Sequence, residues 1–133
     1  MKILHVIDSA GLYGAEMMLL NLMKEQQQMS MNPLLLSIED QNGNSKDSLK
    51  EEAVKRGLNA ERLVLSRGYN PANALKITRF ARVNRMNLVH SHGYKANILL
   101  GSLPKSLRKM PIISTIHGWT SVRIFSKIWL YTL

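Results

Sequence analysis

The regular alternation of short apolar runs with longer segments of helical periodicity constrains this fold most. Between the runs, apolar residues recur every three or four positions, as Ala15, Met18, Leu19 and Leu22 do, which predicts helices. The predicted strands cover 2–7, 33–38, 62–65, 87–91 and 112–116. The predicted helices cover 15–29, a segment from Ser45 or Asp47 to Arg56, 71–85 and about 94–103. Continuous apolar strands are typical of a parallel sheet buried on both faces, so the sequence predicts an α/β domain with strand order 3-2-1-4-5.

The last twelve residues, VRIFSKIWLYTL, are strongly apolar and lack a glycine or a polar tail. Their pattern predicts a final helix that starts near Val122. Because a helix this apolar must bury its surface against other residues, we expect the sequence to stop within a domain.

The composition narrows the possible classes of protein. A chain of 133 residues fits one domain. The chain has no cysteine, which excludes disulfides and thiolate metal sites and favours a reducing, cytoplasmic compartment. The N-terminus does not resemble a secretory signal, and no apolar run has the length of a membrane span.

Charge is distributed unevenly along the chain. Residues 1–61 hold six basic and all nine acidic side chains, whereas residues 62–133 hold twelve basic and no acidic ones. This asymmetry indicates either an anionic partner for the second half or a fragment whose balancing acids lie elsewhere. The stretch KITRFARVNR (76–85) is a basic amphipathic helix, which favours a solvated outer face or a contact with anionic lipid. No recognisable nucleic-acid-binding motif is present, so we expect no nucleic-acid partner.

Three unusual loops follow predicted strands one, four and five. They are DSAGLYGAE (8–16), SHGYK (91–95) and HGWTS (117–121). In an open parallel sheet, ligands bind outside the carboxyl ends of the strands, where the strand order reverses. The predicted order therefore brings these loops together at one edge of the sheet.

Gly11 and Gly14 in the first loop have two explanations. They allow either a tight turn into the helix or a close approach of the backbone to an anion at the helix N-terminus. The spacing matches neither the dinucleotide-binding nor the P-loop motif.

The histidines are the other candidates for chemistry. His5 is expected to be a hydrogen-bonded core residue. His90 and His92 share one face of their strand. A metal pair is conceivable there, but no carboxylate or cysteine lies near them in the sequence. His117 ends a strand and either reaches a ligand, as a hydrogen-bond donor or an acid or base, or ties its own loop together.

The segments MKILHVID, GLYGAEMMLLNL, VHSHGYKANILLG and STIHGWTS occur in an order and at spacings that resemble one known family. The chain is similar, from Met1 to about Ser121, to the N-terminal half of the retaining glycosyltransferases with the GT-B fold called glycosyl transferases group 1. The resemblance implies a Rossmann-like, acceptor-side domain over 1–133, with the donor-binding domain absent. The family's Glu-x7-Glu motif does not occur in the chain.

The resemblance also implies functional residues and partners. His117 corresponds to the catalytic histidine that faces the transferred sugar, and Gly11, Gly14, His92 and Gly118 correspond to residues that bind substrate or donor. The full-length enzyme would transfer a sugar from a nucleotide-sugar donor to a saccharide or lipid-linked acceptor, with retention and without a metal or other cofactor. Such an enzyme fits cell-envelope polysaccharide biosynthesis, in the cytoplasm or peripherally at the inner face of the membrane. The 133-residue chain alone would be inactive.

One alternative stays open. A solitary Rossmann-like domain that binds a ligand without catalysis would share the same sheet and the same loops. It would be a complete chain and would fold as a monodisperse species.

Overall fold

The computed structural model describes residues 1–8, 14–40, 48–65, 71–101, 110–116 and 127–131. Its elements in chain order are β1 (Lys2–Asp8), α1 (Gly14–Gln28), β2 (Asn32–Asp40), α2 (Ser48–Lys55), β3 (Asn59–Leu65), α3 (Pro71–Val83), β4 (Leu88–His92), α4 (Tyr94–Gly101), β5 (Ile112–Ile116) and β6 (Lys127–Tyr131). The predicted alternation of strands and helices is confirmed through β5.

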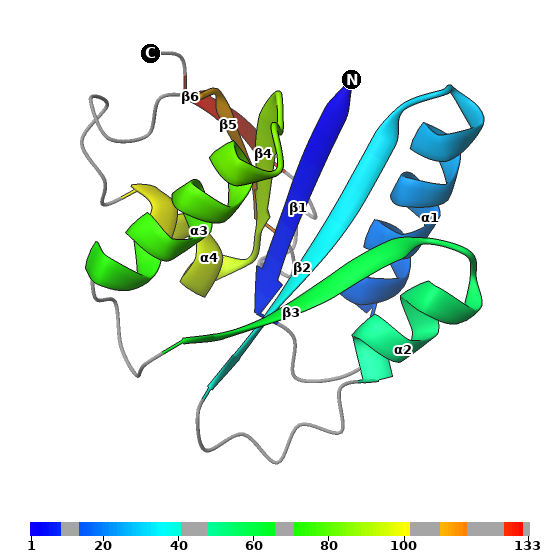
Figure 1. Cartoon of the computed structure of the whole chain (residues 1–133), viewed down its shortest axis with the longest axis horizontal. Helices are drawn as coiled ribbons and strands as arrows, with labels where there is room; N and C mark the ends of the chain where they lie inside the picture. The colour runs from blue at the N-terminus through cyan, green and yellow to red at the C-terminus, as the bar shows by residue number, and fades with distance from the viewer. Residues whose placement is uncertain (9–13, 41–47, 66–70, 102–109, 117–126, 132–133) are drawn as a thin grey trace.

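The strands form one sheet with the order β3-β2-β1-β4-β5-β6 (Figure 1). The first five are parallel, as predicted, and β6 runs antiparallel to β5. In the register at the centre of the sheet, His5 of β1 lies opposite His90 of β4, and Ile7 lies opposite His92. Side chains of residues paired in this way point to the same face of the sheet.

Helices cover both faces of the sheet, with α1 and α2 on one side and α3 and α4 on the other (Figure 1). Alternate residues of each strand divide between the two layers: Leu35 packs with α1 and α2, whereas Leu36 packs with α3 and α4. This division explains why the strands are apolar without alternation, since both of their faces are buried.

The predicted helix from Val122 is wrong where the structure describes that segment, because Lys127–Tyr131 is strand β6. Ile128 and Trp129 are β-branched and aromatic, residue types that favour strands. β5 pairs with β4 along one edge, and its other edge is available to a further strand. β6 pairs with that edge in an antiparallel register that places Ile128 opposite Thr115. Pairing with this edge satisfies backbone groups that a separate helix would leave unpaired on β5.

Three of the helices end in the same way. Ser30 after α1, Gly57 after α2 and Arg85 after α3 all have a positive φ, between 57° and 78°. In each case the amide of the following residue donates to a carbonyl five residues earlier, as Leu58 does to Ala53. In this left-handed turn, a carbonyl of the last helical turn accepts a hydrogen bond that the helix itself does not supply. The caps proposed for α2, Ser45 and Asp47, lie outside the described residues.

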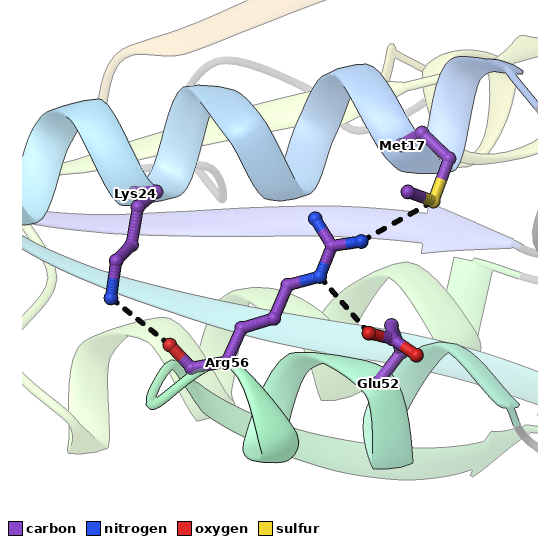
Figure 2. A network of polar contacts seen from close by, with 4 residues as sticks. All are labelled: Met17, Lys24, Glu52 and Arg56. Atoms are coloured by element: carbon purple, nitrogen blue, oxygen red, sulfur yellow. Dashed lines mark hydrogen bonds and ion pairs between the residues drawn. The ribbon is translucent and has the colours of Figure 1, made fainter.

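A polar network joins α1 to α2 over the sheet (Figure 2). The guanidinium of Arg56 donates to Glu52 at 3.0 Å and also contacts the sulfur of Met17, while Lys24 of α1 donates to the Arg56 carbonyl at 3.1 Å. The network links the C-terminal end of α2 to α1 at Met17 and Lys24. Because its ion pair is partly exposed, we expect it to contribute little to the free energy of unfolding.

Candidate functional site

The strand order reverses between β1 and β4, as the sequence predicted. From β1 the chain moves outward to β2 and β3, then returns to place β4 on the other side of β1. The carboxyl ends of β1 and β4 therefore lie side by side, with Asp8 at one and His92 at the other. Helix α1, which follows the first loop, begins at Gly14.

The structure places two of the five predicted site residues. His92 is the last residue of β4 and is buried, and Gly14 is the first residue of α1 and is exposed. Gly11, His117 and Gly118 lie outside the described residues, so their predicted roles stay predictions.

Gly14 is not required by the backbone geometry that the structure describes. Its φ is not in the left-handed region. A Cβ added to Gly14 would meet no atom of the described residues within 4 Å. The turn itself, residues 9–13, lies outside the described residues, so both explanations of Gly14 stay predictions.

Three of the four histidines lie together on the α1 face of the sheet. The rings of His90 and His92 stack at 4.0 Å between centroids, and the ring of His5 lies 5.2 Å from His90 and 5.3 Å from His92. One ring nitrogen from each lies within 4.8 Å of the others. We call His5, His90 and His92 the histidine cluster.

Hydrogen bonds connect the histidine cluster to α1. Nε2 of His5 lies 2.8 Å from the amide oxygen of Gln26, and Nδ1 of His5 lies 3.0 Å from Nε2 of His92. Because an amide oxygen only accepts, His5 donates through Nε2, and its Nδ1 accepts from Nε2–H of His92. Gln26 thus selects the tautomers of both histidines.

Burial keeps His5 neutral. Its side chain is 0% exposed. Loss of hydration lowers the pKa of His5 from 6.5 to about 4, although the hydrogen bond with Gln26 acts in the opposite direction. The expectation of a hydrogen-bonded core histidine is confirmed.

A second polar network ties β4, α4 and β5 together. The backbone amide of Gly93 and the side-chain amide of Asn97 both donate to the Thr115 carbonyl at 3.1 Å. The hydroxyl of Ser91 donates to Asn97, and the Thr115 hydroxyl is hydrogen-bonded to His90. The carboxyl ends of β4 and β5 are therefore held in place from both faces of the sheet.

Sequence reasoning missed Gln26, Asn97 and Thr115. It also did not combine His5 with the later histidine pair, although the predicted strand order already made β1 and β4 neighbours. The register that pairs His5 with His90 was the missing information. No sequence signal marks Gln26, because it occurs in a run of three glutamines.

Comparisons with known proteins identify the family of the chain and agree with its parallel α/β fold. The model of Glycosyltransferase Family 4 matches residues 13–133, nearly the whole chain. The chain belongs to glycosyltransferase family 4. This confirms the resemblance to an N-terminal GT-B-type domain. A search of curated proteins found no match.

Solved structures share the fold at low sequence identity. A glycosyltransferase from Rickettsia africae ESF-5 is 17% identical with a TM-score of 0.55, over 81% of this chain and 32% of that one. A universal stress protein from Archaeoglobus fulgidus, solved in complex with dAMP, is 19% identical with a TM-score of 0.50, over 86% of this chain and 96% of that one. The family 4 chain therefore spans about a third of the glycosyltransferase and nearly all of the stress protein.

Proposed function

We propose that the chain forms the acceptor-side domain of an enzyme that transfers a sugar, with retention, from a nucleotide-sugar donor to a saccharide or lipid-linked acceptor. The family match carries this proposal. The position of His92 at the switch point supports it, because ligands of open parallel sheets bind there.

In this proposal each group at the carboxyl edge of the sheet has a separate role in binding the donor or the transferred sugar. The N-terminus of α1 presents backbone amides and a partial positive charge to the donor diphosphate, and Gly14, which has no side chain, lets it come close to the backbone. His92 lines the cleft, and Gln26 and His5 hold its ring in a single tautomer. His117 hydrogen-bonds to the transferred sugar, with Gly11 and Gly118 keeping the backbone accessible. The transfer needs no metal in this scheme.

The test is sugar transfer by the protein expressed from its natural reading frame. Release of nucleoside diphosphate is followed across a panel of nucleotide sugars with saccharide and lipid-linked acceptors, and NMR of the product gives the anomeric configuration. We expect release with one donor class and a product that retains the donor configuration. The absence of transfer with every pair would overturn the proposal.

Three variants and one control variant test the roles of His117, His92 and Gly14. His117→Ala and His92→Ala are expected to lower kcat/KM at least tenfold, while Lys55→Ala, an exposed change on α2, is expected to leave it unchanged. Gly14→Ala should raise KM for the donor without lowering the Tm, because its Cβ meets no atom of the described residues within 4 Å. A lower Tm with unchanged KM would instead assign Gly14 to the turn.

A second candidate function is ligand binding without catalysis. The likeness to a stress protein solved with dAMP, over nearly the full length of that protein, favours it. This candidate predicts that the 133-residue chain binds a free nucleotide such as AMP in calorimetry. The transferase proposal predicts no such binding by the acceptor-side domain alone.

A further inference from the structure

We propose that the histidine cluster is a binding site for one divalent transition-metal ion such as Zn²⁺. Three ring nitrogens, one each from His5, His90 and His92, lie within 4.8 Å of one another. Three protein ligands with a fourth position for water or another ligand is a common arrangement around zinc. This inference goes beyond the sugar transfer proposed above, which needs no metal.

The chemistry of the donor set selects the class of ion. All three donors are imidazoles, which suit Zn²⁺, Cu²⁺ and Ni²⁺. Mg²⁺ and Ca²⁺ prefer oxygen ligands. The cluster should therefore discriminate strongly against the two hard cations.

The backbone and two neighbouring side chains position these donors. Parallel pairing places His5 of β1 directly opposite His90 of β4, and His92 follows on the same face. Gln26 accepts a hydrogen bond from the ring nitrogen of His5 that points away from His92, which leaves Nδ1 of His5 as an electron-pair donor toward His92. Histidine ligands usually donate their second ring N–H to such a partner. The Thr115 hydroxyl holds His90 in a comparable way.

Binding requires only a local adjustment of the rings. Two nitrogens bound tetrahedrally to zinc lie about 3.3 Å apart. Nδ1 of His5 and Nε2 of His92 are already 3.0 Å apart. Nε2 of His92 carries a proton in this pair, and that proton moves to Nδ1 of the same ring when Nε2 binds the ion, so the ring stays neutral. His90 stacks on His92 and must turn to aim its lone pair at the ion, and it is the less buried of the two.

The ion would join segments that are far apart in the chain. His5 and His92 are separated by 87 positions. A ligand that binds only the folded chain stabilises it by mass action. Zinc should therefore raise the Tm as well as bind.

The first experiment is calorimetric titration of the chelator-treated 133-residue chain with ZnCl₂. In a second experiment, Co²⁺ is added to the metal-free chain as a spectroscopic probe of the same site. We expect one Zn²⁺ per chain, a higher Tm with zinc, and visible cobalt bands of the intensity typical of four-coordination. MgCl₂ should produce neither heat nor a change in Tm.

Substitutions separate the cluster from other histidines and from the fold. His90→Phe and His92→Phe keep a flat ring in the stack and should abolish stoichiometric binding. Gln26→Leu should weaken zinc binding about tenfold. The matched control is Gln27→Leu, the next residue on α1, whose side chain donates to the Gly57 carbonyl instead. It should bind zinc like the unsubstituted chain.

Two outcomes would overturn the site. One is the absence of a saturable one-to-one zinc complex with the unsubstituted chain. The other is unchanged zinc affinity in folded His90→Phe and His92→Phe, with far-ultraviolet circular dichroism reporting that each variant folds.

Discussion

At the scale of single residues, His5 shows how burial controls the charge of a side chain. Its ring contacts Gln26 from α1 and His90 and His92 from β4. None of these neighbours carries the negative charge that would favour an imidazolium. The ring is therefore neutral at pH 7, the form in which it accepts from His92 and could ligate a metal.

The lowered pKa of His5 predicts how stability depends on pH. The folded pKa of about 4 lies below the unfolded value of 6.5, so the unfolded chain binds the extra proton between these values. Stability should be fully present above pH 6.5 and be lost progressively as pH falls from 6.5 to the folded pKa of about 4, by about 3 kcal/mol in total.

Urea unfolding of the metal-free chain at several pH values measures this loss. His5→Gln should reduce the slope between pH 6.5 and 4 by close to one proton, because it removes the group that the unfolded chain protonates and the folded chain does not. An unchanged slope in His5→Gln would contradict the assignment to His5.

At the scale of elements, the helix ends offer a different test. Arg85 holds a φ of 57° after α3, a conformation that costs a residue with a Cβ about 1 kcal/mol relative to glycine. Gly57 occupies the equivalent place after α2 without that cost.

Arg85→Gly should therefore raise the free energy of unfolding by about 1 kcal/mol. Arg85→Ala removes the same charge without relieving the backbone and should be close to neutral. Chemical denaturation of both variants separates the two effects, and equal gains would attribute the stabilisation to charge instead.

At the scale of the whole molecule, the two faces of the sheet differ in charge. α3 presents Lys76, Arg79 and Arg82 as exposed side chains, followed by exposed Arg85, whereas α1 and α2 on the opposite face carry acidic residues as well. Among the described residues, no helix is long and apolar enough to cross a membrane. We propose that the α3 face contacts anionic lipid through its charge.

Cosedimentation with vesicles tests this contact. The chain should bind vesicles that contain anionic lipid, lose binding at high salt and ignore neutral vesicles. Lys76→Glu with Arg82→Glu should abolish binding, whereas Lys55→Glu on α2, exposed on the other face, should reduce it less. Binding that is independent of anionic lipid would contradict the proposal.

Sequence alone was sufficient for the α/β class, the parallel strands β1 to β5, their order and the reversal of that order between β1 and β4. These follow from local periodicity and from the few ways in which a chain can connect parallel strands. The same reasoning placed His92 at the switch point, because the end of an apolar run is visible in the sequence.

Tertiary structure alone decided two other features. The segment ending in KIWLY is apolar enough for either a helix or a strand, and the free edge of β5 makes Lys127–Tyr131 a strand. His5, Gln26 and His92 form one hydrogen-bonded chain because the register of β1 on β4 and the packing of α1 bring them within 3.0 Å. Such contacts join residues far apart in the sequence, and local periodicity contains no information about them.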